Sequence, residues 1–416
     1  MFKGDFFTTG VVNLGGRNYF MNFKVYILAV SIFVVGMVEL IMGGILPLIS
    51  ADMNVSVSTA GQLTTVFALV LGVAAPILLA LTAKVERKKL YLTSLFIFFI
   101  SNLITYFSPN FTVLMIARVL TAGSAALLII LSLTMAAKLV PPAFQARAIG
   151  VITMGISASL VLGIPIGVLI GNAFGWRVIF LIIACLSLVA MLVIYKFIDS
   201  MQPEKAVPLR EQFATLKTSK IITAHLVTVF MLAGHYMIYA YFTPFLQESL
   251  GASATMISIA YLVFGFAAVT GGGMGGWLSD KIGPIKSILS IVGIFAITLF
   301  ILPASTSVPF IFAIVLIIWG MLSWALSPPQ QTYLIQTAPE SAAIQQSINT
   351  SALQLGIALG SALGGIVIQS FPVSSTAWFG GGVAIVAFLC AVYSIKQPTK
   401  HAESAETKGS PLPEEA

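Results

Sequence analysis

Of the 14 Asp and Glu residues in the sequence, only Glu39 stands well inside a long apolar run. A carboxylate at the centre of a bilayer costs about 3 kcal/mol on insertion scales, so an acid kept there usually faces a cavity and handles ions. Burial also brings the protonation of a carboxyl group toward the physiological pH range. We therefore predict that Glu39 carries protons. The alternative is a protonated Glu39 that packs by hydrogen bonding to a neighbouring helix.

Arg118 is the only basic residue deep in an apolar run. A guanidinium buried without compensation is costly, so Arg118 needs an opposite charge or a water-filled cavity beside it. This makes Arg118 the second residue whose chemistry we expect to matter.

Three aromatic side chains are candidates for binding a flat molecule: His235, Tyr236 and Tyr239. His235 and Tyr239 are four residues apart and share a helix face, while Tyr236 lies on the flank. Such rings can stack on a substrate and form hydrogen bonds to it. A hydrogen-bonded packing histidine is the alternative for His235. Tyr241, near the far end of the same run, is more typical of an interfacial anchor.

The pair Pro328-Pro329 must break or bend its helix, because each proline removes a backbone donor. We expect a gate hinge there. Gln330 and Gln331 follow directly, and we expect them to line the opening that a hinge creates.

Four further side chains complete the expected substrate contacts: Trp319, Trp324, Asn349 and Gln354. Amides are hydrogen-bonding groups of the kind that the edge of a nucleobase would use. The alternative for the amides is bonding between helices, usually worth about 1 kcal/mol or less in a membrane. We interpret His225 as a boundary residue at the mouth of its run.

The elements that must position these side chains are membrane helices. Hydrophobic residues make up 58% of the chain and charged residues 8%, whereas a soluble protein has roughly 25% charged residues. Apolar runs of about twenty residues indicate helices rather than barrel strands. We predict an all-α integral membrane fold with twelve spans, at residues 25–49, 58–82, 90–108, 111–137, 146–171, 177–197, 223–247, 254–278, 286–305, 308–334, 343–369 and 376–396.

The longest polar interval separates six spans from six. We therefore divide the chain into a tail at 1–20, a first bundle at 21–198, a cytoplasmic linker at 199–222, a second bundle at 223–397 and a disordered tail at 398–416. All but two of the 21 Lys and Arg residues fall on the cytoplasmic side if both termini lie there, the exceptions being Arg118 and Arg177. The positive-inside rule then fixes this orientation.

Small residues recur at four-residue spacing in both halves, which allows helix backbones to approach closely. Gly163, Gly167 and Gly171 form one ladder in the fifth span, and Gly356, Gly360 and Gly364 form another in the eleventh. A third close-packing face runs from Gly271 to Gly276. Static packing explains each ladder alone, but their equivalent placement favours two bundles that rock about a central site.

Over residues 21–397 the chain resembles the major facilitator superfamily, in two six-helix pseudo-repeats, and more narrowly its bacterial drug–proton antiporter branch. The stretch Gly36-Met-Val-Glu39-Leu-Ile-Met-Gly43-Gly-Ile-Leu-Pro47 is similar to the opening signature of that branch. Arg118-Val-Leu-Thr-Ala-Gly123 resembles an Arg-centred motif linked to proton coupling, with Thr121 and Ala122 replacing the usual residues. The resemblance implies that Glu39 and Arg118 line one cavity as neighbours and couple protons, a fixed structural ion pair being the alternative.

Gating residues also follow from the resemblance. The stretch Gly276-Trp-Leu-Ser-Asp280-Lys281-Ile-Gly283 is close to the signature loop between paired spans, whose copy in the first half is degraded. In that copy Ala83 stands where Asp is usual and Glu86 where Gly is usual, which puts its gating interaction in doubt. The residues to which the resemblance gives a gating role are Arg87, Lys88, Gly163, Pro165, Gly167, Asp280, Lys281 and Gly283. The expected hinge prolines Pro328 and Pro329 complete the gating set.

The segments 228–244 and 345–354 look like those of Gram-positive purine base and nucleoside efflux pumps. This resemblance implies proton-coupled efflux of purine bases, nucleosides or analogues. Efflux of drugs, sugars or amino acids by the same mechanism is the alternative, and a non-transporting membrane sensor is a more remote one.

No sequence pattern of an enzyme is visible. The chain lacks a P-loop, an HExxH motif and clustered His and Cys residues, so we expect no catalytic residue, cofactor or metal, and a proton gradient as the driving force. We expect the partners to be a small-molecule substrate, protons and the lipid bilayer, with no nucleic acid. We expect a monomer in the bacterial cytoplasmic membrane.

Overall fold

The computed structural model describes residues 12–14, 17–19, 22–203, 215–216 and 218–397. Within them, twelve helical segments are long and apolar enough to cross a membrane. All twelve overlap the predicted spans, which confirms the predicted fold. Two short antiparallel strands, β1 (Val12–Leu14) and β2 (Arg17–Tyr19), pair in the segment assigned to a tail. The expected tail at 398–416 and half of the expected linker at 199–222 lie outside the described residues.

The helices form two compact units. Unit 1 comprises Met1–Asn54 and Ala74–Ala206, and unit 2 comprises Val55–Val73 and Val207–Ala416. The helix α3 (Val57–Leu81) therefore contributes its first part to unit 2 and its last part to unit 1.

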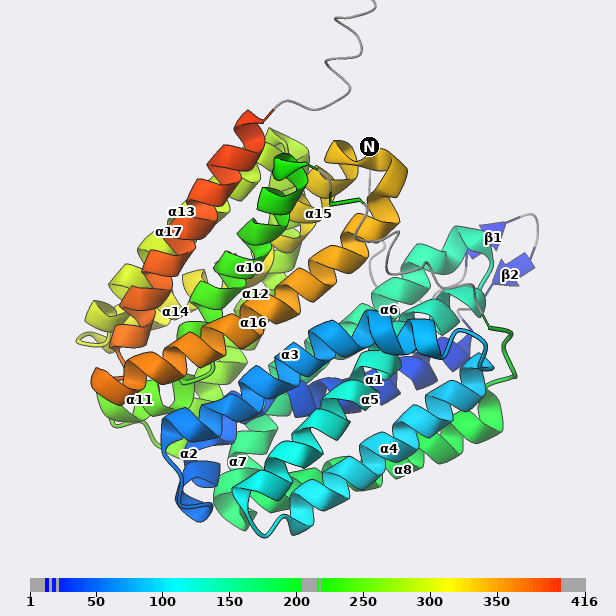
Figure 1. The fold of residues 1–416 in the computed structure, drawn as a ribbon, viewed down its shortest axis with the longest axis horizontal. Helices are drawn as coiled ribbons and strands as arrows, with labels where there is room; N and C mark the ends of the chain where they lie inside the picture. The colour runs from blue at the N-terminus through cyan, green and yellow to red at the C-terminus, as the bar shows by residue number, and fades with distance from the viewer. Residues whose placement is uncertain (1–11, 15–16, 20–21, 204–214, 217, 398–416) are drawn as a thin grey trace, which may run out of the picture. The chain divides into compact units, whose positions relative to one another are not determined.

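Unit 1 is a bundle in which α4 packs against α5 and α8, and α1 packs against α6 (Figure 1). Besides the last part of α3, the elements of unit 1 are α1 (Phe23–Leu40), α2 (Met42–Asp52), α4 (Arg87–Phe107), α5 (Phe111–Lys138), η1 (Pro142–Phe144), α6 (Gln145–Ala158), η2 (Ser159–Gly163), α7 (Ile164–Phe174) and α8 (Trp176–Phe197).

Unit 2 is built around α10, which packs against α16 and α17 along its length (Figure 1). Besides the first part of α3, the elements of unit 2 are α10 (Ser219–Tyr239), α11 (Phe242–Leu250), α12 (Ala254–Ile282), α13 (Pro284–Ser305), α14 (Pro309–Ala325), α15 (Ser327–Thr337), η3 (Pro339–Ser341), α16 (Ala342–Ser370) and α17 (Ser375–Lys396).

Helix breaks in unit 2 lie just before prolines. The predicted break near Pro328 and Pro329 is confirmed, because α14 ends at Ala325 and α15 begins at Ser327. Neither proline can donate to a carbonyl one turn earlier, so the preceding turn opens. In the same way, α10 ends at Tyr239 and α11 begins at Phe242, just ahead of Pro244.

The glycine ladder of unit 1 faces α1 and α2. A Cβ atom on Gly163 would stand 2.8 Å from Met37 Cγ, and one on Gly171 would stand 3.2 Å from Ile45 Cγ2. Only a residue without Cβ permits such an approach. The predicted close packing is confirmed for this ladder.

The ladder of unit 2 faces α10 in the equivalent way. A Cβ atom on Gly356 would lie 2.5 Å from the Val229 carbonyl oxygen, and one on Gly364 would lie 2.6 Å from that of Met237. The third predicted face packs α12 on α14, where a Cβ on Gly275 would overlap the Ala325 carbonyl. The ladder therefore packs against α1 and α2 in unit 1 and against α10 in unit 2.

The first part of α3 is hydrogen-bonded to α16 within unit 2. Ser58 Oγ donates to the Gly365 carbonyl (2.7 Å), and Ser361 Oγ donates to that of Gly61 (3.2 Å). The Tyr241 hydroxyl donates to the Ser361 carbonyl (2.9 Å) and is fully buried. The interpretation of Tyr241 as an interfacial anchor is therefore wrong, because its hydroxyl serves contact between helices.

Candidate functional site

Glu39 and Arg118 lie together in unit 1. Arg118, on α5, is 1% exposed, and its Nη1 donates to the carbonyl oxygen of Val38 (3.2 Å). The half-buried Glu39, next to Val38 on α1, interacts electrostatically with the Arg118 guanidinium. The neighbourhood that the resemblance implies for this acid and this cation is therefore present in the structure.

The end of α1 explains why a buried cation is stable here. The helix ends at Leu40 and α2 begins at Met42, so Val38 lies in the last turn of α1. The last four carbonyls of a helix lack partners in the helix, and its C-terminal end carries a partial negative charge. Arg118 fills one of these acceptor positions. It gains both the carbonyl and the adjacent acid as compensation for lost water.

A π-helical segment, η2, packs beside the same part of α1. It ends at Gly163, two residues before Pro165, whose missing N–H disrupts the regular ladder of helix hydrogen bonds. A Cβ on Gly36 would overlap Ser159 Oγ of this segment. The two irregular stretches therefore face one another close to Glu39, and π-turns of this kind are frequent at functional sites.

The degraded signature copy between α3 and α4 has a clear local structure. Glu86 caps α4 by accepting from the amides of Lys88 (2.9 Å) and Lys89 (2.8 Å), and it also accepts from the Met201 amide (2.7 Å). The amide of the buried Arg87 donates to the Met201 carbonyl (2.9 Å). Glu86, which stands where glycine is usual, therefore links the segment after α8 to the start of α4.

The same end of unit 1 holds an ion pair between Lys24 and Asp199. Its hydrogen bond from Lys24 lowers the pKa of Asp199 below the ordinary value. For Glu86, burial raises the pKa, but hydrogen bonds from the amides of Met201, Lys89 and Lys88 outweigh it and leave the pKa lowered. Lys88 also lies over the ring of Tyr195, with Nζ 5.5 Å from its centroid.

The intact signature copy lies at the end of α12. Gly283 follows this helix with a φ of +83°, a left-handed value that only glycine adopts without strain. Asp280 and Lys281 are exposed, and Lys281 Nζ stands 4.7 Å from the centroid of the Trp277 ring.

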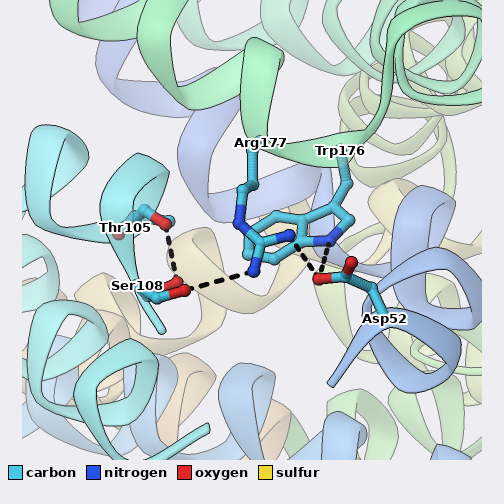
Figure 2. Close-up of polar contacts among 5 residues, drawn as sticks. All are labelled: Asp52, Thr105, Ser108, Trp176 and Arg177. Carbon is cyan, nitrogen blue, oxygen red and sulfur yellow. Dashed lines mark hydrogen bonds and ion pairs between the residues drawn. The ribbon is translucent and has the colours of Figure 1, made fainter. Parts of the chain in front are cut away.

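Arg177, one of the two basic residues outside the positive-inside pattern, is part of a polar clamp (Figure 2). It forms an ion pair with Asp52, and Trp176 Nε1 donates to the same carboxylate oxygen (3.2 Å). Arg177 Nη2 also donates to the Ser108 carbonyl (3.1 Å), and its guanidinium lies 4.6 Å from the centroid of the Trp176 ring. The clamp joins α2, the end of α4 and the start of α8.

The predicted aromatic residues of unit 2 form one buried cluster. The rings of His235 and Tyr239 stack with centroids 4.9 Å apart, and Trp319 lies 5.2 Å from His235. Tyr236, at the edge, meets His235 edge-on at 5.1 Å. The shared face predicted for positions 235 and 239 is confirmed. Ser323, which the sequence did not single out, lies with Oγ 3.2 Å from His235 Nδ1.

Two polar atoms in this aromatic cluster are noteworthy. The Tyr239 hydroxyl and Trp319 Nε1 are buried and make no hydrogen bond within the described part of the chain. Buried polar groups are usually paired, so each of these atoms calls for a ligand or a functional reason.

A second cluster contains two of the predicted amides. Thr228 Oγ1 donates to Asn349 Oδ1 (2.8 Å), and Gln330 Nε2 donates to the carbonyl oxygen preceding His225 (2.6 Å). His225 Nε2 pairs with Gln345 Oε1 (2.8 Å). His225, expected at the boundary of its run, lies in the second turn of α10 with a side chain that is only 6% exposed. The sequence signal for this buried cluster is that His225 is a polar residue within an otherwise apolar run.

The remaining predicted side chains lie apart from these clusters. Trp324 is 37% exposed, and Gln331 is exposed and donates to Ser327 Oγ on its own helix (3.2 Å). Gln354 is buried where α16 meets α3, with its Cβ 2.8 Å from the position of a Cβ on Gly72.

Comparison with known proteins gives consistent matches over almost the whole chain. A family model for the Major Facilitator Superfamily matches residues 28–351. The uncharacterized MFS-type transporter YbcL of Bacillus subtilis (strain 168) is 33% identical over 91% of this chain and 97% of its own. A probable sugar efflux transporter of Mannheimia succiniciproducens is 29% identical over 88% of this chain and 93% of its own.

Solved structures share the fold. A bacterial homologue of the human lysosomal transporter Spinster, in an inward-facing and occupied conformation, matches with a TM-score of 0.75 and 17% identity over 91% of this chain and 97% of that one. The human organic anion transporter MFSD10 matches with a TM-score of 0.66 and 14% identity, over 88% of this chain and 98% of that one. These neighbours are transporters and not enzymes. This chain is a multi-pass membrane transporter of small molecules, and it belongs to the Major Facilitator Superfamily.

Proposed function

We propose that the chain is a proton-coupled exporter, in which protons moving inward drive a small molecule outward. The observation that carries this proposal is the position of Glu39 beside the buried Arg118. The cation favours the charged carboxylate, whereas burial favours the neutral acid. A small change in solvation or in the position of α1 then loads or releases a proton.

Further observations support the proposal that transport is outward and is driven by the proton gradient. The sequence contains no ATP-binding motif, so the proposed energy source is the proton gradient without a cofactor. The distribution of basic residues supports insertion in the bacterial cytoplasmic membrane with both termini in the cytoplasm. The name of the Mannheimia relative supports efflux. We propose that the transporter works as a monomer.

For the substrate we propose a purine base, a nucleoside or an analogue. The support is the resemblance of residues 228–244 and 345–354 to purine efflux pumps, together with the aromatic cluster around His235. The buried Tyr239 hydroxyl and Trp319 N–H are donors of the kind that ring nitrogens and carbonyls of a purine accept. A sugar is the second candidate, because one relative is described as a probable sugar efflux transporter.

The test uses purified protein in proteoliposomes with an imposed pH gradient. Radiolabelled adenine, adenosine and glucose serve as probes, and a lumenal pH dye reports proton movement. We expect adenine or adenosine to accumulate against its gradient together with counterflow of protons. The substitution Glu39→Gln should abolish both, since an amide cannot release a proton.

Glu248→Gln is the matched control, because Glu248 is an exposed acid on α11. It should leave transport unchanged. Undiminished proton counterflow in the Glu39→Gln protein would remove Glu39 from the mechanism. Coupled transport of glucose alone would replace the purine assignment with the sugar, and absence of any flux in a screen that includes lipophilic cations and amino acids would favour a sensor.

A further inference from the structure

The cluster around His225 joins three helices of unit 2. It contains His225 and Thr228 of α10, Gln330 of α15, and Gln345 and Asn349 of α16, and each of these side chains is less than a tenth exposed. His225 Nε2 and Gln345 Oε1 are 2.8 Å apart. Buried polar groups at a meeting point of helices are costly unless their hydrogen bonds are complete.

The bond directions fix the state of the imidazole. Gln345 Nε2 donates to Ser341 Oγ (3.2 Å), so the oxygen of the same amide faces His225. An amide oxygen only accepts, and His225 Nε2 must therefore carry the hydrogen. A neutral imidazole has one N–H group. His225 Nδ1 is consequently a bare acceptor.

This acceptor has no donor. Within the described residues His225 Nδ1 is buried without a hydrogen-bond partner, and so is Oε1 of Gln330. Gln330 Nε2 donates to the Ala224 carbonyl (2.6 Å), so this amide lies on the same turn of α10 as His225. His225 Nδ1 and Gln330 Oε1 are thus acceptors with no donor at hydrogen-bond distance, and the Asn349 side chain is the further polar group that interacts with the His225 ring.

We propose that His225 is a proton-binding site in unit 2, separate from Glu39. A second proton on the ring converts Nδ1 from an unsatisfied acceptor into a donor, and it leaves the bond to Gln345 intact. Proton binding by His225 is independent of the proposed function. Only a role of that proton in transport rests on the proposed function.

The surroundings decide when the proton is held. None of α10, α15, α16 and α17 carries a carboxylate. On the same helix Lys220 donates to the Gln397 carbonyl (3.0 Å), α16 has no ionisable side chain, and Tyr333 of α15 is hydrogen-bonded to Ser394. On α17 the ionisable groups are Cys390, Tyr393 and Lys396. The acid next to these helices along the chain is Glu340 of η3, and it is exposed. With no buried acid on the four helices to pair the imidazolium, protonation requires water, so the proton is bound when this end of unit 2 hydrates and is released when it closes.

The test follows the imidazole directly. The chain has three histidines, so ¹⁵N-histidine NMR of the full chain in lipid nanodiscs is simple to interpret, and the signal that vanishes in His225→Gln assigns His225. We expect that signal to move from neutral to charged ring shifts as the pH is lowered from about 8 to about 4.5. A signal that stays neutral throughout overturns the inference.

A pair of variants makes the test sharper. Gln345→Glu places a carboxylate next to Nε2 and should move the titration midpoint upward by about 1–3 pH units, the usual effect of an adjacent opposite charge. Gln346→Glu, the same change at the next position, is the matched control, because Gln346 is only partly buried and donates to the Gln331 carbonyl. Equal shifts in both variants would overturn the inference.

The two proposals can fail independently. In the Glu39→Gln protein the His225 titration should persist while proton-coupled flux is lost. If flux depends on Glu39 but His225 does not titrate, the proposed function holds and this inference fails.

Discussion

The Arg118 guanidinium donates a hydrogen bond to the carbonyl oxygen of Val38, 3.2 Å away, in the last turn of α1. The bond attaches α5 to the backbone beside Glu39, whose carboxyl group adds an electrostatic interaction with the guanidinium. The cation therefore keeps a fixed partner when Glu39 changes its protonation state. In the proposed transport cycle, a proton therefore binds to Glu39 and leaves it without leaving Arg118 uncompensated.

The first prediction concerns this arrangement. Arg118→Gln should lower pH-gradient-driven transport at least tenfold, because the neutral side chain no longer favours the charged form of Glu39. A double-mutant cycle with Glu39→Gln, read from thermal unfolding, should give a coupling energy of about 0.5–3 kcal/mol, as is typical of residues in direct interaction. Strictly additive effects on stability would show that the two side chains act separately.

A second prediction concerns two glycines at close helix contacts, Gly155 of α6 and Gly360 of the unit 2 ladder. A Cβ on Gly155 would lie 2.5 Å from the Ala29 carbonyl oxygen, and one on Gly360 would overlap the Ala233 backbone. Backbone atoms cannot rotate away, so Gly155→Ala and Gly360→Ala should each cost about 1–3 kcal/mol of stability through overpacking. Thermal unfolding in detergent measures this loss.

The control for the ladders is Gly272→Ala. Nothing lies within 4 Å of a Cβ at Gly272. Alanine is favoured over glycine inside a helix by about 0.5–1 kcal/mol, so this protein should be as stable as the original or slightly more so. Equal destabilisation by all three substitutions would argue against a contact effect.

A third prediction concerns pH. Because the pKa of Glu86 is lowered on folding, its contribution to stability is present above the unfolded value of about 4.3 and is lost as pH falls through the lower folded value. The hydrogen bonds to the amides of Met201, Lys88 and Lys89 should weaken in that acid range. Hydrogen exchange at these three amides measures the change.

Glu86→Gln should reproduce this loss at neutral pH. Removing a helix cap costs about 1 kcal/mol. The variant should exchange the three amides faster at pH 7 and show a weaker further response to acid. If its exchange rates match those of the original protein at pH 7, the carboxylate has no role in fastening Met201.

A fourth prediction concerns the clamp of Figure 2. Asp52→Asn removes the charge that Arg177 and Trp176 share. Since both partners of the ion pair are partly exposed, the loss should be about 1 kcal/mol or less. The difference between the two proteins should shrink in 1 M salt, where surface charges are screened. Thermal unfolding at low and high salt provides the measurement.

A fifth prediction separates packing from binding in the aromatic cluster. Tyr239→Phe keeps the ring that stacks on His235 and removes only the buried hydroxyl, which has no hydrogen-bond partner within the described residues. If this hydroxyl contacts substrate, binding should weaken about tenfold, in line with the value of one hydrogen bond. Equilibrium binding of adenine and adenosine measures this loss, with melting temperature as the control.

The packing alternative gives the opposite pattern. Removing a buried polar atom that has no partner should then leave affinity unchanged and raise the melting temperature. Trp324→Phe is a useful comparison, since Trp324 is partly exposed and lies outside the cluster.

The helices and their close contacts were predictable because both depend on residue type and spacing. Twelve apolar runs must become helices to satisfy their backbone in lipid. A glycine every fourth residue can only mark a close approach, as the contacts of Gly163 and Gly360 confirm. The break before Pro328 likewise follows from a missing N–H group.

Other features depend on backbone atoms or distant pairings, which residue types do not encode. The Val38 carbonyl binds Arg118 only because α1 ends there. His225 meets Gln345 across 120 positions of sequence, and this pairing has no local signal. At Glu86 the sequence shows only a departure from a motif, because its hydrogen-bond partner Met201 lies 115 positions away.

The proximity of Glu39 and Arg118 also bears on how the protein enters the membrane. Chains are made from the N-terminus, so α1 leaves the ribosome before α5. The acid can therefore already be in the bilayer when the helix with the guanidinium arrives, and it can reduce the insertion cost of about 3 kcal/mol that a lone arginine incurs. We therefore expect membrane insertion of α5, the fourth spanning segment, to depend on a residue translated 79 positions before Arg118, at position 39.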